Sequence, residues 1–230
     1  MTIIDAQVHI WKPETADRPY IKEDASKPHR PVPLGYENLL QEMKTAGVER
    51  VILVPPSWDG YRNDYALEAA QKYPDRFAVM GKVPLNDPAS KERLAGWLKQ
   101  PGMLGFRISF RHGGTHSWLD DGTGNWFWSE CERFDIPVMI FAPFAVAKIG
   151  EIAARHPGLR VIVDHMGLNV QWKGKSLAPA VDAVLAFARM KNVAVKASCL
   201  PCYVDENYPY PALHPQIRRV VETNRDERNY

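Results

Sequence analysis

The sequence is short of cysteine, of net charge and of long hydrophobic runs. Three cysteines in 230 residues argue against a disulfide framework and favour a reducing compartment. With 29 basic and 27 acidic residues, the formal net charge of +2 gives no reason to expect nucleic acid or an anionic membrane as a partner. No stretch is apolar over the length of a membrane span, and Asp5 and His9 interrupt the first apolar run before it reaches signal-peptide length. We therefore expect a cytoplasmic protein.

Strand-like and helix-like segments alternate along the chain. Apolar runs predict strands at residues 2–11, 48–54, 77–83, 103–108, 137–141, 159–164 and 193–197. Apolar residues at helical spacing predict helices at residues 36–46, 64–73, 88–99, 125–134, 145–155, 177–190 and 213–222. Such repeated units imply a parallel sheet with right-handed crossovers. The sequence thus predicts one α/β domain over residues 1–230, a (β/α)8 TIM-type barrel whose eighth strand is missing, ending in a polar tail.

Polar side chains stand at the carboxyl ends of the predicted strands, where a barrel carries its chemistry. His9 ends the first strand and His165 the sixth, so we expect both imidazoles at one mouth. There they could act as general acid and base, bind a metal or polarise a carbonyl group, although each could also be a hydrogen-bonded core residue. Arg107 and Arg111 follow the fourth strand and suit an anionic substrate, because a guanidinium holds a carboxylate with two bonds.

Three further residues are candidates for contact with substrate. Trp11 and Trp58 adjoin strand ends and could line a pocket. Lys196 could touch substrate, or it could pair with a carboxylate, because an unpaired ammonium among apolar neighbours is costly. Since adjacent strand residues face opposite ways, we expect His165 at the mouth and Asp164 in a structural position. The long polar stretch 12–33 is typical of a functional or disordered loop.

The order of three motifs resembles the amidohydrolase-related family of TIM-barrel hydrolases. They are Asp5-Ala-Gln-Val-His9-Ile-Trp, Val161-Ile-Val-Asp-His165-Met-Gly and Val193-Ala-Val-Lys196-Ala-Ser. The resemblance is nearest to the branch that includes 2-pyrone-4,6-dicarboxylate lactonase and sugar-lactone hydrolases. It implies a distorted barrel that hydrolyses a small anionic lactone or related carbonyl compound. The resemblance also implies that Arg107, helped by Arg111, anchors a carboxylate of the substrate, while His9 and His165 polarise its carbonyl group.

The chain departs from the metal-dependent members of this family at three points. Gln7 stands where the family has a first histidine, Phe141 where it has a fifth-strand ligand, and no eighth-strand aspartate follows. Only His9 and His165 map onto the family's metal ligands, and a catalytic zinc needs about three protein ligands. We therefore expect no zinc or other cofactor; a bound divalent metal would use these two histidines.

Two other interpretations remain open. A different branch of the superfamily implies a metal-dependent decarboxylase. The missing strand and its aspartate also fit an impaired hydrolase, or a non-catalytic binding protein or remnant. An uncovered sheet edge invites pairing with another strand, so a homo-oligomer that covers this edge is a further expectation.

Overall fold

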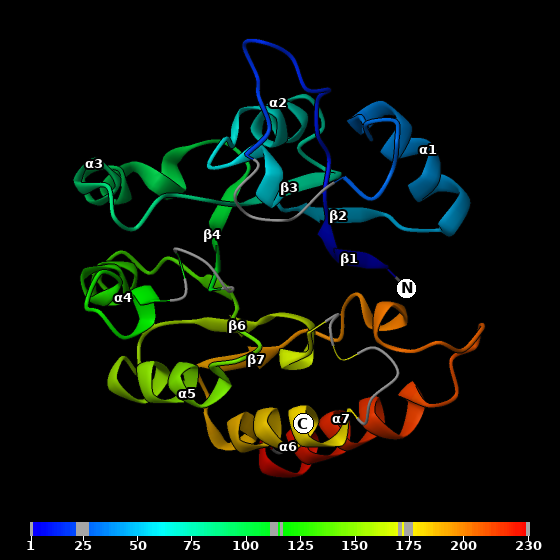
Figure 1. Cartoon of the computed structure of the whole chain (residues 1–230), viewed down its shortest axis with the longest axis vertical. Coiled ribbons are helices and arrows are strands. Elements are labelled where there is room, and N and C mark those ends of the chain that lie inside the picture. Colours follow the sequence, from blue (N-terminus) through cyan, green and yellow to red (C-terminus); the bar gives the residue numbers. More distant parts are fainter. Residues whose placement is uncertain are drawn as a thin grey trace. The chain divides into compact units, whose positions relative to one another are not determined.

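Seven parallel strands and the helices that follow them make up the computed structural model of this chain (Figure 1). It describes residues 2–21, 28–110, 115, 117–169, 172 and 177–228, with side chains described as far as residue 224. The strands are β1 (Ile4–Val8), β2 (Arg50–Leu53), β3 (Phe77–Gly81), β4 (Met103–Ser109), β5 (Val138–Phe141), β6 (Val161–Val163) and β7 (Val193–Val195). The helices are α1 (Tyr36–Ala46), α2 (Asp64–Lys72), α3 (Pro88–Glu92), α4 (Asn125–Arg133), α5 (Val146–Arg155), α6 (Ala178–Leu185) and α7 (Leu213–Arg228). The predicted α/β class is confirmed.

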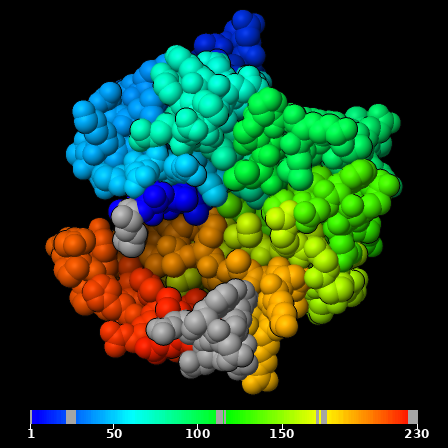
Figure 2. Space-filling view, turned by 180° about the vertical axis from the view of Figure 1, so that it is seen from behind, coloured from blue at the N-terminus to red at the C-terminus, as the bar shows by residue number. Residues whose placement is uncertain are grey.

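Residues 1–107 form one compact unit and residues 108–230 a second, and the prediction of a single domain stays a prediction. In the first unit β1, β2, β3 and the start of β4 pair in parallel, with Val51 of β2 opposite Phe77 of β3. Helix α1 ends at Gly47 in the left-handed conformation that glycine adopts without strain, as its position predicts. Figure 2 shows the outer surface of α1 in blue beside that of α2 in cyan. The Tyr36 hydroxyl of α1 donates a hydrogen bond to the Glu68 carboxylate of α2.

The core of the first unit forms between these strands and the helices that follow them. Trp97 stacks on Phe106 of β4 with the ring centroids 4.1 Å apart. Its indole N–H donates to the Gly105 carbonyl oxygen at 3.0 Å, so a large aromatic side chain is buried with its polar atom satisfied.

The second unit pairs β5, β6 and β7 in parallel, with Val161 of β6 between Val138 and Val193. All three of these valines are buried, as expected for a parallel sheet covered by helices. Helix α5 buries Ile149 and Ile152, and α6 packs against α7. None of the described helices combines the length and the apolarity that crossing a membrane requires.

Three element boundaries differ from the prediction. The predicted helix 88–99 is α3 followed by a separate 3₁₀ helix, η2 (Leu94–Lys99), in a segment that contains Gly96, which disfavours an α-helix interior. Helix α7 runs through the predicted polar tail to Arg228, where the sequence offers no glycine or proline to stop it. Strand β6 ends at Val163, so Asp164 and His165 lie outside it in the 3₁₀ turn η4 (Asp164–Gly167).

Candidate functional site

His9 directly follows β1 and is fixed by one backbone contact. Its Nδ1 lies 2.7 Å from the carbonyl oxygen of Val54, which follows β2. A carbonyl oxygen can only accept a hydrogen bond, so Nδ1 carries the proton and donates it. In the neutral ring Nε2 is then unprotonated and can accept a hydrogen bond or bind a metal.

The surroundings of His9 keep its ring neutral. Burial of the ring in a weakly polar environment is the largest cause that lowers its pKa, the cations Arg107 and Lys82 add to the shift, and the bond to Val54 opposes it. Together these effects place the pKa at about 3. At neutral pH the imidazole is therefore uncharged. This does not suit the predicted polarising role for His9, because the neutral ring has no N–H left to donate at Nε2.

The pKa of His9 makes stability depend on pH in a defined direction. The unfolded chain carries this histidine with the ordinary value of 6.5, whereas the folded chain holds it at about 3. Between these values the unfolded chain binds the extra proton, so the free energy of unfolding is expected to fall as pH decreases through that window. Urea unfolding from neutral pH down to about pH 4 should show a smaller acid loss in His9→Asn than in the native chain. Equal slopes would contradict the shift.

Two buried cations accompany His9 in the first unit. Lys82 follows β3 and Arg107 lies in β4, and their exposed fractions are 6% and 5%. The Asn63 side chain fixes the Lys82 backbone in both directions: it accepts from the Lys82 N–H at 2.8 Å and donates to the Lys82 carbonyl at 2.9 Å. The carboxyl ends of β1, β3 and β4 thus bring one neutral imidazole and two cations together.

Aromatic rings pack around His9. Trp58 lies in the 3₁₀ helix η1 (Ser57–Asp59), with its ring 6.0 Å from His9 and 5.3 Å from Trp11. Both tryptophans are buried, at 5% and 1% exposed. His29 contacts both rings, at 5.4 Å from Trp11 and 6.1 Å from Trp58. The structure places Trp58 beside His9 and Trp11 beside Trp58, and the prediction that the two tryptophans line a pocket stays a prediction.

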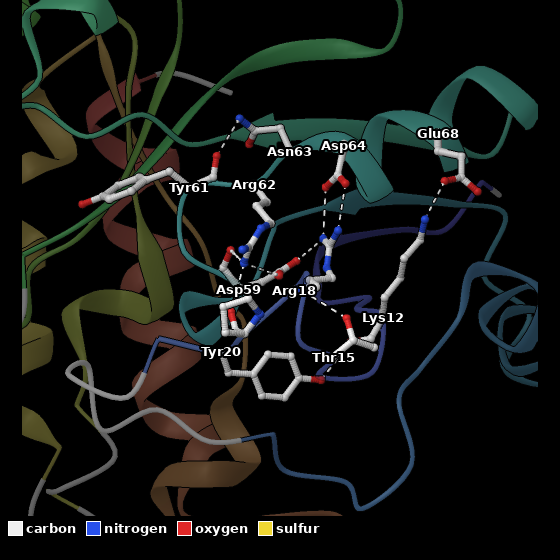
Figure 3. Close-up of polar contacts among 11 residues, drawn as sticks. Lys12, Thr15, Arg18, Tyr20, Asp59, Tyr61, Arg62, Asn63, Asp64 and Glu68 are labelled. Atoms are coloured by element: carbon white, nitrogen blue, oxygen red, sulfur yellow. Dashed lines mark hydrogen bonds and ion pairs between the residues drawn. The ribbon is translucent and has the colours of Figure 1, made fainter.

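A network that sequence reasoning missed ties the segment after β1 to the rest of the unit (Figure 3). This segment, residues 12–21, is called the strap below. Arg18 donates to Asp59 at 2.5 Å and makes two bonds to Asp64 of α2, at 2.8 and 3.0 Å. The bonds from Arg18 hold the pKa of Asp64 below its ordinary value. Part of the predicted loop 12–33 is therefore an ordered element, and residues 22–27 lie outside the described chain.

His165 lies in the turn η4 of the second unit and is 6% exposed. Its Nδ1 lies 2.8 Å from the Ser198 hydroxyl, and its ring stands edge-on to Phe141 at 5.4 Å. A hydroxyl can donate or accept, so this bond orients the ring without fixing its tautomer. His165 has φ +55°, a left-handed conformation that is uncommon for residues other than glycine and that concentrates at functional sites.

Lys196 follows β7 and pairs with Asp164. Its Nζ lies 2.9 Å from Asp164 Oδ1, and the exposed fractions of the side chains are 9% and 0%. This confirms the alternative in which Lys196 pairs with a carboxylate, and its contact with substrate stays a prediction. The argument that Asp164 and His165 face opposite ways on a strand was wrong, because both residues follow the strand and both are buried.

Two predictions about the site stay untested, and some residues of the site were not predicted. Arg111 lies outside the described residues. His9 and His165 belong to different units, and their common mouth stays a prediction. Asn63 and Arg18 were not predicted as site residues, since only contacts between distant segments give them a role.

The residues present do not fit the metal that the resemblance implies. The unprotonated Nε2 of His9 can bind a metal ion, but Gln7 stands in β1 where metal-dependent relatives have a second histidine. The apolar ring of Phe141 packs on His165 where a metal-dependent relative would have a ligand. Within the described ranges, no group of three histidine, cysteine or acidic side chains is arranged to hold a metal ion. No step of the proposed chemistry is therefore assigned to a metal.

Comparison with known proteins gives the family. The amidohydrolase family model matches residues 4–228, and the chain belongs to this family. The L-fucono-1,5-lactonase of Burkholderia ambifaria is 25% identical over 225 residues, which cover 95% of this chain and 75% of that protein. The 4-sulfomuconolactone hydrolase of Hydrogenophaga intermedia is 24% identical over 226 residues, 96% of this chain and 71% of that protein.

A solved structure shows the fold. The probable 2-pyrone-4,6-dicarboxylic acid hydrolase of Acinetobacter baumannii, with citric acid bound, matches with a TM-score of 0.74 at 18% identity. The match covers 99% of this chain and 80% of that chain. The chain therefore has a TIM-barrel-like amidohydrolase fold, with seven parallel strands in its described residues. The predicted family and fold are both confirmed.

Proposed function

We propose that this chain hydrolyses a small anionic lactone or a related carbonyl compound. The observation that carries the proposal is the set of side chains at the strand ends of the first unit. There, the unprotonated Nε2 of His9 is accompanied by the buried cations Lys82 and Arg107. Such a set combines a hydrogen-bond acceptor for water with a positive potential for a carboxylate.

Each residue has a separate task in this proposal. Arg107 binds the substrate carboxylate, because its planar fork matches the two carboxylate oxygens. His9 accepts a hydrogen bond from the attacking water at Nε2 and orients it, which replaces the polarising role predicted from sequence. The catalytic role predicted for His165, whose ring is oriented by Ser198 in the second unit, is not assigned to a step here. The water oxygen bonds to the carbonyl carbon, the ring C–O bond breaks, and the water proton ends on the released hydroxyl group.

The names of the relatives support lactone chemistry. The two curated relatives are a sugar lactonase and a sulfomuconolactone hydrolase, and the solved structure is a probable pyrone dicarboxylic acid hydrolase. Two of these names describe anionic molecules. The negative charge of those two molecules agrees with the cations beside His9.

The proposal is tested by measuring hydrolysis of paired lactones, one carrying a carboxylate and one neutral. Arg107→Lys keeps the charge but loses the two-bond fork, so we expect kcat/KM for the anionic lactone to fall by about tenfold or more. The neutral lactone should change much less, and the ratio of the two removes any general loss of folded enzyme. Arg30→Gln, which breaks an exposed pair with Glu42, is the matched control and should change neither rate.

Two results would contradict the proposal. Equal losses for the anionic and the neutral lactone would exclude Arg107 as the carboxylate anchor. Release of carbon dioxide from hydroxybenzoates without any lactone hydrolysis would favour the decarboxylase alternative. The turnover of the native chain also tests the expectation that it is an impaired hydrolase.

A further inference from the structure

Trp58 buries a hydrogen-bond donor that nothing in the described chain satisfies. Its side chain is 5% exposed, and its Nε1–H has no hydrogen-bond partner among the described residues. An indole N–H can only donate, and burying it without an acceptor is unfavourable because its bond to water is lost. Trp97, in the same unit, is buried as well, at 1% exposed, but its indole N–H donates to the Gly105 carbonyl. The fold therefore gives the Trp97 N–H an acceptor and leaves the buried Trp58 N–H without one among the described residues.

Contacts on several sides hold the Trp58 ring in place. Trp11 stands perpendicular to it at 5.3 Å, and His9 lies 6.0 Å away at 67°. The Trp58 carbonyl accepts from the Ile21 N–H of the strap at 2.8 Å. The next residue, Asp59, is 2% exposed and bonded to Arg18 at 2.5 Å. With both ring and backbone held, the indole cannot easily turn to find a partner inside the protein.

We propose that Trp58 Nε1–H is a specificity-determining donor that binds an acceptor oxygen of the substrate. This inference rests on the proposed function and adds a recognition element to the same site. The acceptor is a carboxylate, carbonyl or lactone ring oxygen, because an indole N–H can bond only to an acceptor. The cations Lys82 and Arg107 act on the neighbouring His9, so an anionic oxygen is favoured.

His9 and Trp58 offer complementary groups to such a ligand. Nε2 of His9 accepts and Nε1 of Trp58 donates, and the two rings lie 6.0 Å apart, so a ligand that contacts both must carry a donor and an acceptor. Nε1 is shielded from solvent, so an oxygen that reaches it leaves water too, and a hydrogen bond formed there is stronger than one at the surface. A ligand of the same shape without this acceptor would leave the donor unsatisfied and bind less well.

The experiment follows the indole N–H resonances of the chain, labelled with ¹⁵N at its seven tryptophans, during titration with citrate as an anionic probe. The Trp58 resonance is identified as the signal missing from Trp58→Phe. We expect it to move downfield as citrate binds, whereas the Trp97 resonance stays in place because its N–H is already bonded.

Two matched substitutions complete the test. Trp58→Phe keeps an aromatic ring and removes an unsatisfied donor, so citrate affinity should fall by about tenfold with no loss of thermal stability. Trp97→Phe leaves the Gly105 carbonyl unpaired, so its melting temperature should fall while citrate affinity is unchanged.

The outcomes separate this inference from the proposed function. A Trp58 resonance that does not move at the highest citrate concentration, or a Trp58→Phe variant that binds citrate as the native chain does, overturns the inference. A Trp58 resonance that moves in a chain without lactone hydrolysis supports the donor and contradicts the hydrolase. If the chain hydrolyses lactones and Trp58→Phe hydrolyses them equally well, the hydrolase is supported and the role of Trp58 as a donor is contradicted.

Discussion

Replacing Lys196 with methionine is expected to lower the free energy of unfolding by about 3–5 kcal/mol. The substitution removes the cation that lies 2.9 Å from Asp164, whose side chain is completely buried. A buried carboxylate that loses its counter-charge has given up its hydration and no longer has the ion pair that compensated for it. Because a domain of ordinary stability has about 5–15 kcal/mol in total, much of the variant would unfold at moderate urea concentrations. Urea unfolding followed by circular dichroism measures the change.

A double substitution and an exposed pair provide the controls. Lys196→Met combined with Asp164→Leu removes both charges and should recover most of the lost stability, because no isolated charge stays buried. Arg133→Met breaks the exposed pair with Glu130 and should change stability by less than about 1 kcal/mol. A loss in Lys196→Met no larger than in Arg133→Met would show that the buried pair contributes little.

Replacing His9 with asparagine is expected to lower kcat/KM by about 10²-fold, the loss that misplacing a reacting group can produce. The asparagine amide can still donate to the Val54 carbonyl in place of Nδ1, but it has no acceptor in the position of Nε2. Orientation of the attacking water should therefore be lost while the local backbone contact is kept. Lactone hydrolysis under subsaturating substrate measures the effect, and thermal unfolding at neutral pH checks that the variant is folded.

His156→Asn is the matched control for this experiment. His156 directly follows α5 and bonds to Glu132 at 2.9 Å through the same ring nitrogen, Nδ1. It has no part in the proposed mechanism, so activity should be unchanged. Full activity in His9→Asn, or an equal loss in His156→Asn, would contradict the role of His9.

Much of the fold could be predicted because local patterns carry it. The runs of β5, β6 and β7 are apolar and rich in β-branched residues, and Gly47 follows α1 where a left-handed residue is needed. The end of β6 could not be predicted. His165 and Met166 both have positive φ, and no periodicity in the sequence signals a left-handed turn of residues other than glycine.

A contact in the site could be predicted only where the chemistry of a single residue and its sequence neighbours was enough to indicate its partner. The charge of Lys196 among apolar neighbours correctly indicated a carboxylate partner, since an isolated buried ammonium is unfavourable. The tautomer of His9 depends on a carbonyl 45 residues away, and no local pattern reports that contact. Arg18 likewise obtains its role from Asp59 and Asp64, which are distant in sequence.

The backbone at His165 narrows the choice of side chains that the position can accept during evolution. A residue with φ +55° pays a steric penalty that is severe for valine, isoleucine and threonine and small for asparagine, aspartate and glycine. Drift away from histidine would therefore lead first to short polar residues, whatever the chemistry requires. Short polar residues or glycine at this position in related chains would be the trace of that constraint.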